Sequence, residues 1–203
     1  MRGPATYKVI DLAVASGQEE HVGKIRVHEF TTMDGVIDEP RWSFDFGFDP
    51  KMGAAIGKAM GGCQAILLGR VTYQMFEPAW SARTAEEDPG APFMNDTTKY
   101  VISSTLTNTT WRNSEIAGPY GPDAIRKLKD QVDGDLYVSG SGTLVRALLG
   151  DGLVDELHLF VYPLTRAGGP ALFGRETGSR RWALADSQAY DNGVLYLNYT
   201  TAS

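Results

Sequence analysis

The order of apolar and polar positions predicts an α/β protein in which strands and helices alternate. Residues 24–37 alternate along the chain, which predicts a strand with Ile25, Val27 and Glu29 on one face and then a loop. Residues 64–70 (QAILLGR) form an almost continuous apolar run, which is typical of a strand buried on both faces of a parallel sheet. β-Rich runs at 99–105 and 135–139, and later in the chain, extend the series of strands.

Helical signals fill the gaps between these strands. Residues 49–63 carry Asp49 at the capping position and Pro50 in the first turn, and two glycines mark the end of the helix. Residues 71–76 predict a helical turn or two, and residues 121–132 have the apolar stripe of an amphipathic helix. A further apolar helix follows the strand at 135–139 without a gap.

The end of the chain changes to successive strands. Residues 81–92 are charged and rich in Pro and Gly, which predicts a loop, whereas 156–164, 182–190 and 194–200 are β-rich. Asp-Asn-Gly at 191–193 predicts a hairpin between the last two. Early alternation requires parallel crossovers and the closing strands require antiparallel pairing. We therefore expect a mixed, mostly parallel central sheet flanked by helices, with antiparallel C-terminal strands.

Composition narrows the classes of protein and partner. The 203 residues suit one domain over 24–203, and we interpret residues 1–23 as a flexible N-terminal extension. A net charge of −6 without a dense basic patch argues against nucleic acid as a partner. No apolar run approaches the roughly 18–20 residues of a membrane span. The single cysteine, Cys63, cannot form an internal disulfide, so we expect a cytoplasmic protein and treat Cys63 as a packing residue.

The turn at 139–142 (SGSG) joins a strand to a helix and is a candidate anion site. Helix N-termini attract anions through free N–H groups and the helix dipole, and Ser141 or Thr143 could cap this helix. The alternative is a tight turn with no ligand, because Gly-x-Gly alone is a weak signal. A Rossmann fingerprint does not fit, since Val145 stands at the third glycine position and no acidic residue ends the next strand.

Two other predicted strand ends carry similar residues. Gly69, Arg70 and Thr72 follow one strand, and Ser103 and Ser104 follow another. Ligands of such sheets gather at the carboxyl ends of strands, and the planar fork of an arginine suits a phosphate. Each feature alone is explained by a surface ion pair or by ordinary turn chemistry. The three strand ends together favour a ligand with more than one phosphate.

An ordered set of motifs resembles a known superfamily. The motifs are TTMDGVI at 31–37, LLGRVTY at 67–73, KYVISSTL at 99–106, LYVSGSGTLVRALL at 136–149, VDELHLFVYPLTRAGGPALF at 154–173 and NGVLYLNY at 192–199. They resemble the dihydrofolate-reductase-like superfamily, and most closely the reductase domain at the C-terminal end of bifunctional riboflavin-biosynthesis deaminase/reductases. The resemblance implies a three-layer fold and a reductase that takes NADPH, with NADH less expected. The residues implied to hold the cofactor are Gly69, Arg70, Thr72, Ser103, Ser104, Gly140, Ser141, Gly142 and Thr143.

Candidates for the chemistry are fewer. Hydride transfer needs a sheltered site and a proton source, and we consider Asp34 in the family's Asp-Gly element and Glu77 beyond the Arg70 turn. Asp34 could equally be a turn residue, and Glu77 a surface helix end. Trp42 and Phe44 could form a flat wall for a heteroaromatic substrate, with Asp45 as a polar contact, although core packing is the commoner use of aromatics.

The remaining residues do not indicate a further catalytic or metal site. His28 and His158 lie inside predicted strands, where we interpret both as structural, and no Cys/His spacing indicates a metal site. The zinc-deaminase pattern is absent from the sequence, which predicts a stand-alone reductase of a small heterocyclic or carbonyl compound, resembling 5-amino-6-(5-phosphoribosylamino)uracil reductase. The alternative is a non-catalytic dinucleotide-binding module with a sensing or structural role. A homodimer that covers exposed strand edges is also expected.

Overall fold

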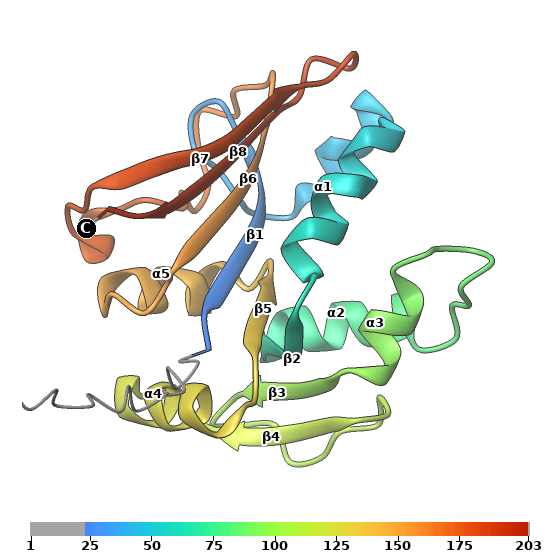
Figure 1. Cartoon of the computed structure of the whole chain (residues 1–203), viewed down its shortest axis with the longest axis vertical. Coiled ribbons are helices and arrows are strands. Elements are labelled where there is room, and N and C mark those ends of the chain that lie inside the picture. The colour runs from blue at the N-terminus through green and yellow to red at the C-terminus, as the bar shows by residue number, and fades with distance from the viewer. Residues whose placement is uncertain (1–22, 203) are drawn as a thin grey trace, which may run out of the picture.

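A computed structural model describes residues 23–202 and contains one eight-stranded sheet in the order β4-β3-β2-β5-β1-β6-β8-β7 (Figure 1). Six strands are parallel, β8 is antiparallel to β6 and β7 is antiparallel to β8. The mixed, mostly parallel sheet predicted from the sequence is therefore confirmed. The strands are β1 (Ile25–Thr32), β2 (Cys63–Gly69), β3 (Thr98–Ile102), β4 (Ser114–Gly118), β5 (Asp135–Ser139), β6 (Glu156–Tyr162), β7 (Trp182–Ala189) and β8 (Leu195–Thr201).

Helices cover both faces of the sheet and complete three layers (Figure 1). On one face, Ile125 and Leu128 of α4 and Leu148 of α5 pack against the apolar residues of β1, β2 and β5. On the other face, apolar residues of α1, α2 and α3 pack in two clusters. The helices are α1 (Pro50–Met60), α2 (Arg70–Trp80), α3 (Ala91–Asp96), α4 (Pro122–Gln131) and α5 (Gly142–Gly150), with short 3-10 turns η1 (Pro40–Phe46) and η2 (Arg175–Thr177).

Several predictions that rest on the local preferences of individual residues are confirmed. Asp49 caps α1 by accepting the Lys51 N–H at 2.9 Å, as predicted. The hairpin between β7 and β8 forms with Gly193 at a positive φ of 84°, a conformation that favours glycine. Cys63 is buried among apolar side chains, which confirms its interpretation as a packing residue. The predicted extension at residues 1–23 lies outside the described residues, apart from residue 23.

Three elements differ from the prediction. Helix α2 runs for 11 residues instead of a turn or two, and α3 forms at the end of the predicted loop, with Pro92 in its first turn. The edge strand β4 has no counterpart in the prediction. Its pattern is mostly polar and partly exposed, so its pairing with β3 provides the order that its own sequence does not specify. Among the described residues no helix is both long and apolar enough to cross a bilayer.

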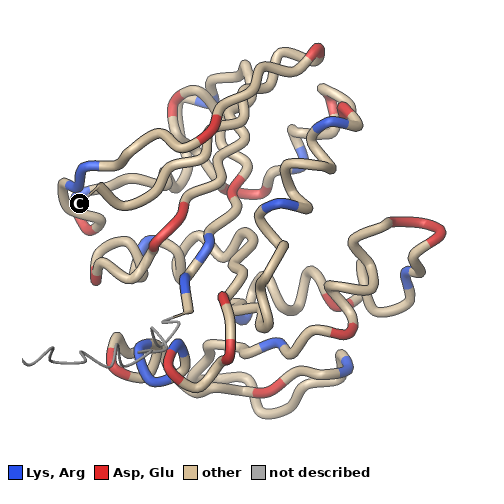
Figure 2. Tube along the Cα trace, in the orientation of Figure 1, with Lys and Arg blue, Asp and Glu red and all other residues tan. Residues whose placement is uncertain are grey.

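Charged residues join β1, β5 and β6 where these strands begin. The Lys24 N–H donates to Asp135 at 2.7 Å, Arg26 forms an ion pair with the same carboxylate, and the Lys24 ammonium lies 2.9 Å from Glu156. A hydrogen bond with His158, followed by one from Lys24, lowers the pKa of Glu156 to about 2. Lys and Arg lie beside Asp and Glu at this end of the sheet (Figure 2).

We predict that Asp135→Ala destabilises the protein by about 3–5 kcal/mol, because it leaves the partly buried Arg26 guanidinium without this carboxylate. The free energy of unfolding in urea measures the effect. The matched control is Asp186→Ala, which removes an exposed pair with Lys58 (3.6 Å) and is expected to cost less than about 1 kcal/mol. Equal losses in the two variants would contradict a structural role for the buried pair.

Candidate functional site

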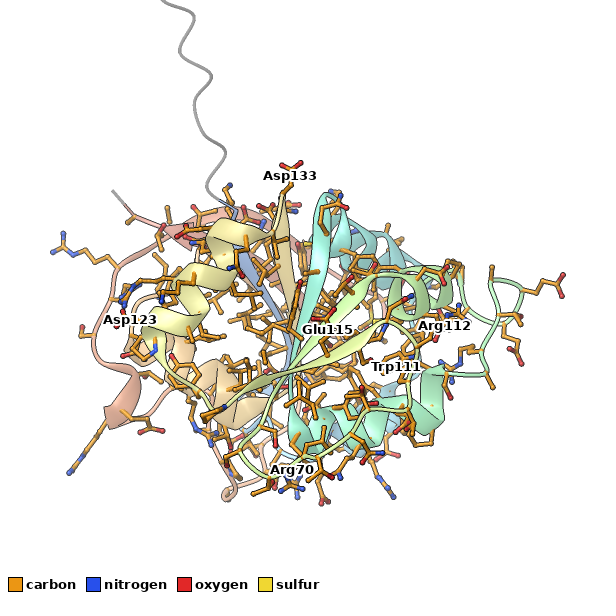
Figure 3. The ribbon with its side chains drawn as sticks, turned by 90° about the horizontal axis from the view of Figure 1, so that it is seen from below. Arg70, Trp111, Arg112, Glu115, Asp123 and Asp133 are labelled. Carbon is orange, nitrogen blue, oxygen red and sulfur yellow. The ribbon has the colours of Figure 1, made fainter. Side chains whose placement is uncertain are left out.

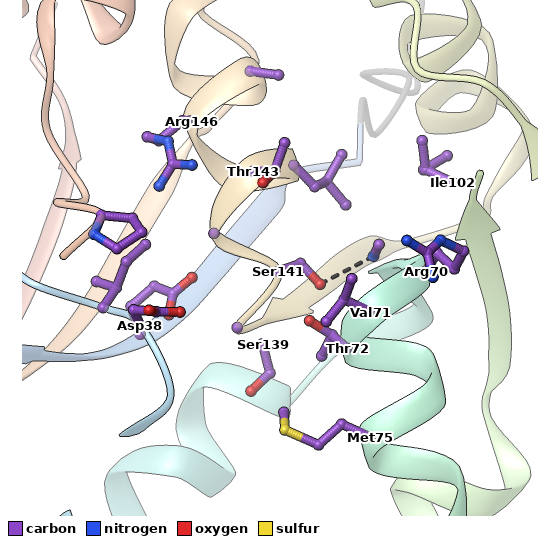
Figure 4. Close-up of a pocket in the computed structure, with 18 of the residues that line it drawn as sticks. Asp38, Arg70, Val71, Thr72, Met75, Ile102, Ser139, Ser141, Thr143 and Arg146 are labelled. Atoms are coloured by element: carbon purple, nitrogen blue, oxygen red, sulfur yellow. Dashed lines mark hydrogen bonds between the residues drawn. The ribbon is translucent and has the colours of Figure 1, made fainter. Parts of the chain in front are cut away.

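A cavity of about 890 Å³ opens where the sheet splits (Figure 4). The pairing of β1 with β5 ends at His28 and Ser139, whereas β1 stays paired with β6 as far as Thr32. Beyond Ser139 the edge of β1 that faces β5 therefore borders open space. The cavity occupies this gap, between β1 and the β2–α2 connection, and extends past the end of β3.

The three predicted phosphate-binding segments meet in this one cavity. They come from the ends of β2, β3 and β5, which the parallel sheet brings to the same edge. Figure 3 shows Arg70 at one end of the strands and Asp133 at the other. Cavity-lining residues that the sequence predicted are Gly69, Arg70, Thr72, Ser103, Ser104, Gly140, Ser141, Gly142 and Thr143.

The glycine turn is shaped by two left-handed residues. Gly140 has φ of 60° and Ser141 has φ of 67° at the N-cap position of α5. The predicted capping by Ser141 or Thr143 is wrong, because within residues 23–202 no side-chain hydrogen bond caps this helix. The Ser141 hydroxyl instead accepts the Gly69 N–H at 3.0 Å (dashed in Figure 4). This bond ties the turn after β5 to the turn after β2 and leaves the N-terminal N–H groups of α5 without a side-chain cap.

Close packing fixes where the first turn of α5 lies. A Cβ on Gly142 would lie 2.7 Å from Cδ1 of Ile37 and 3.5 Å from Nη1 of Arg146, so glycine allows the loop after β1 to approach the helix. Helix α2 begins beside it at Arg70, after Gly69 at its own uncapped N-cap position. Two helix N-termini therefore lie at one cavity, and their dipoles favour an anion there.

Arg70 and the serines differ in how free they are to meet a ligand. The exposed Arg70 guanidinium donates to the Gln74 side chain at 2.9 Å, a contact within α2 that a ligand could replace. The Ser103 hydroxyl accepts the N–H groups of Thr105 and Leu106, so it serves mainly to shape the turn. Ser104 is exposed at the rim. Arg70 is therefore the cation of this predicted set that can turn toward a phosphate.

The structure does not bring Asp34 or Glu77 to the cavity. The Asp34 carboxylate accepts hydrogen bonds from Thr32 and from the N–H groups of Ala167 and Arg166, and these bonds lower its pKa, that from Thr32 most. It thus anchors a turn, which is the alternative that the sequence left open. Glu77 lies in the second half of α2 and accepts from the Thr110 hydroxyl. Both carboxylates are outside the set of residues that line the cavity.

The predicted aromatic wall also lies elsewhere. Trp42 packs edge-on against Tyr162, with ring centroids 5.2 Å apart, and this contact belongs to the apolar cluster under α1. Phe44 is 80% exposed and Asp45 is exposed beside it, and none of the three lines the cavity. They sit on η1, a 3-10 segment that the sequence pattern did not reveal.

Sequence reasoning missed four charged residues of the lining: Glu29, Arg146 and, at the rim, Asp38 and Glu39. Glu29 is 3% exposed, its Oε1 has no hydrogen-bond partner in the described part of the chain, and burial raises its pKa to about 8. The sequence does carry a signal for Glu29, because it is an acidic residue on the same predicted face of β1 as the apolar residues Ile25 and Val27. Arg146 follows Gly142 by one helical turn, a spacing that brings both to the same side of α5.

The two histidines within strands are buried and hydrogen-bonded to tyrosine hydroxyls. His28 Nδ1 lies 2.6 Å from the Tyr137 hydroxyl, and His158 Nδ1 lies 2.8 Å from the Tyr196 hydroxyl. Burial, followed by the charge of His158, lowers the pKa of His28 to about 3. This bonding fits the structural interpretation, although His28 also lines the cavity. Within residues 23–202 no cluster of three or more His, Cys, Asp or Glu side chains could hold a metal ion.

Comparison with known proteins identifies the family. Residues 23–196 match the family profile of the RibD C-terminal domain. The chain is 24% identical over 179 residues to the uncharacterized protein YyaP of Bacillus subtilis, covering 83% of this chain and 89% of that protein.

Solved structures share the fold at low identity. A Shewanella sp. PV-4 protein named for riboflavin biosynthesis superposes with a TM-score of 0.68 at 20% identity, covering 89% of this chain and 99% of that one. The deaminase/5-amino-6-(5-phosphoribosylamino)uracil reductase of Thermotoga maritima gives 0.62 at 13% identity, over 89% of this chain and 57% of that longer protein. Dihydrofolate reductase of Enterococcus faecalis, complexed with NADP(H), gives 0.58 at 15% identity, over 90% and 98%. The dihydrofolate-reductase-like fold predicted from the motifs is confirmed.

The buried carboxyl of Glu29 predicts a pH-dependent stability. Because the pKa of Glu29 rises from 4.5 to about 8 on folding, the folded state holds a proton between these values that the unfolded state has lost. Wild-type stability should therefore fall, relative to Glu29→Gln, by up to about 1.4 kcal/mol per pH unit as the pH rises through this window.

Urea unfolding of both proteins at several pH values between 5 and 8 measures this difference. Glu115→Gln is the matched control, since Glu115 is exposed on β4 (Figure 3) and should give a pH-independent difference from wild type. Parallel stability curves for wild type and Glu29→Gln would show that Glu29 is ionised in the folded protein.

Proposed function

Because the chain belongs to the RibD C-terminal domain family, we propose that it is an NADPH-dependent reductase that transfers a hydride to a small heterocyclic or carbonyl substrate. The observation that carries the proposal is the meeting of three phosphate-binding candidates in one cavity. The ends of β2, β3 and β5 are far apart in sequence, and each alone has an ordinary structural explanation. A cavity that joins all three to a split in the sheet fits an elongated ligand with several phosphates.

The residues present fit a dinucleotide at its phosphate end. The uncapped N-termini of α2 and α5 offer backbone N–H groups to a diphosphate, and Gly140 and Gly142 let the backbone approach it. Arg70, with Ser104 at the rim, would meet a further phosphate on the adenosine side, where a planar guanidinium can donate two hydrogen bonds. This arrangement favours NADPH over NADH, because NADH lacks that phosphate.

The gap in the sheet fits the nicotinamide end. The His28 carbonyl accepts the Gly140 N–H, and the alternation of a β-strand directs the peptide group of Phe30 to the same side, toward the gap. A carboxamide would pair with such a peptide edge. Ile37, Ile102 and Leu144 supply apolar lining that limits water around the reacting carbon. The cofactor would provide the hydride, and the chain provides binding, orientation and shelter.

The names of relatives support the class of reaction and of substrate. The Thermotoga maritima protein is named for reduction of a phosphoribosylamino-uracil, and the Enterococcus faecalis protein is a dihydrofolate reductase that carries NADP(H). Both names describe reduction of a compound that contains a nitrogen heterocycle. We infer the same class of acceptor here, with its ring bound in the part of the cavity nearest β1.

Arg70→Ala is predicted to weaken NADPH binding by about 1–3 kcal/mol, or roughly 5- to 150-fold, because a charged hydrogen bond to phosphate is lost. NADH binding should change little, since the affected phosphate is absent from NADH. Isothermal calorimetry with both nucleotides gives the two dissociation constants. Arg126→Ala removes an exposed arginine from α4, outside the cavity, and is the charge-matched control. Equal effects of the two substitutions would place the phosphate elsewhere.

The reductase activity itself predicts consumption of NADPH that depends on an acceptor. Loss of nicotinamide absorbance is followed with the intact chain against a panel of aminopyrimidines, pterins and small carbonyl compounds. Turnover that depends on both the acceptor and the folded chain is the expected result. NADPH binding without turnover across the panel would favour the non-catalytic dinucleotide-binding module instead.

A further inference from the structure

Glu29 differs from the other buried carboxylates of the sheet. Asp135 and Glu156 lie where β1, β5 and β6 begin; Asp135 forms an ion pair with Arg26, and Glu156 forms ion pairs with Lys24 and Arg26. Glu29 lies on the same strand near its other end, is 97% buried, and has an Oε1 with no hydrogen-bond partner among the described residues. A buried polar atom without a partner costs free energy, so a folded protein that keeps one invites a functional explanation.

The position of Glu29 joins this unpaired atom to the cavity. Glu29 immediately follows His28, the last residue of β1 that pairs with β5, so it stands where the sheet opens. Glu29 and Arg146 of α5 are both among the residues that line the cavity. A carboxyl group at this place is next to the gap that fits the nicotinamide and acceptor rings. Rim carboxylates in the same cavity, Asp38 and Glu39, are exposed to water.

The groups around Glu29 leave it uncharged at neutral pH. Burial raises its pKa to about 8, and the charge of Arg146 acts in the opposite direction but is the smaller influence. The Arg146 guanidinium also forms an ion pair with the Glu176 carboxylate at 3.4 Å, so part of its positive charge is balanced by Glu176. His28, the adjacent residue on β1, is neutral because burial lowers its pKa to about 3, and the nearby Tyr137 hydroxyl is also protonated because burial raises its pKa. Glu29 therefore holds a proton inside the cavity.

We infer that Glu29 is the proton donor of the reduction, a role that rests on the proposed function of the cavity. The acceptor carbon gains a hydride from the reduced nicotinamide, and the electron pair of its C=N or C=O π bond moves onto the nitrogen or oxygen. That atom takes the proton from the Glu29 carboxyl, which becomes a carboxylate and recovers a proton from water. The substrate is reduced by two electrons and the cofactor is oxidised by two. A carboxylic acid kept neutral by burial suits this step because its pKa lies near the working pH.

The inference selects a class of substrate. A neutral carboxyl donates a hydrogen bond to a basic ring nitrogen or a carbonyl oxygen, and it gives no ionic attraction to a cationic acceptor. We therefore expect an acceptor with a neutral C=N or C=O group, bound with that group toward Glu29. A phosphate on the acceptor could not lie against Glu29 and would have to be bound at another part of the lining, where Arg146 is a cation within the cavity.

Infrared spectroscopy tests the proton directly and needs no substrate. The carbonyl stretch of a protonated carboxyl is well separated from carboxylate bands, and subtraction of Glu29→Gln from wild type isolates the Glu29 signal. Spectra are taken between pH 5 and 9, with and without NADPH, and calorimetry on the same samples records NADPH binding. We expect a protonated band at pH 7 that shifts when NADPH binds, because Glu29 faces the same cavity.

Three results would overturn the inference, and they have different meanings. A band that is absent at pH 7, or that ignores bound NADPH, removes Glu29 as the donor and leaves the proposed reductase intact. Failure of wild type to bind NADPH overturns both the inference and the proposed function. Should Glu29→Gln not fold, carbon-13 labelling of glutamate in the wild-type chain assigns the same band without a substitution.

Kinetics with an acceptor from the panel supplies a second readout. Glu29→Gln should lower kcat by about 10²- to 10⁴-fold while the Kd for NADPH stays unchanged, because an amide cannot transfer the proton. Glu115→Gln, on the exposed edge strand β4, should match wild type in both constants. An unchanged kcat in Glu29→Gln, or an equal loss in Glu115→Gln, would contradict the assignment.

Discussion

The early end of β5 is the constraint on which the site depends. β1 continues after its pairing with β5 ends at Ser139, and the sheet separates there into two parts. The chain turns away at Gly140 and Ser141 through two left-handed residues, and α5 begins at once. The hydrogen bond from the Gly69 N–H to the Ser141 hydroxyl then ties the turn after β5 to the turn after β2. The cavity, the two open helix ends and the exposed edge of β1 all follow from this arrangement.

Charge is distributed unequally along the strands. Near their N-terminal ends, buried and half-buried carboxylates form ion pairs with Lys24, Arg26 and Lys129. At the cavity, Glu29 is buried, its Oε1 has no hydrogen-bond partner among the described residues, and burial favours the neutral form of the carboxyl group. Removing one partner of the ion pairs at the N-terminal ends of the strands leaves an uncompensated buried charge. Replacing Glu29 with glutamine has the opposite effect at high pH, because it removes a buried carboxylate charge. The same residue type therefore serves stability at one end and, in our proposal, chemistry at the other.

The sequence predicted the elements with strong local chemistry and the residues that their ends bring together. The Asp49 cap, the Asp-Asn-Gly hairpin and the apolar run of β2 depend on neighbouring residues, so they could be recognised without the fold. The three phosphate-binding candidates met in one cavity because the carboxyl ends of parallel strands share an edge. β4 could not be recognised in this way, since its order comes from pairing with β3.

The catalytic candidates were harder to predict, because burial and partners decide the role of a carboxyl group. Asp34 is in a motif, but its oxygens accept two backbone N–H groups in a turn. Glu29 is in no motif, and only its position on the inner face of β1 distinguished it. Trp42 and Phe44 followed the expectation that aromatics line a ring-binding site, but both sit on η1 and neither lines the cavity.

Calorimetric titration of the intact chain with NADPH, and in parallel with NADH, tests the central claim most directly. The account predicts saturable binding of NADPH at one site per chain and weaker binding of NADH, because Arg70 lies in the cavity for the additional phosphate. Absence of saturable binding for both nucleotides would contradict a dinucleotide site in the cavity.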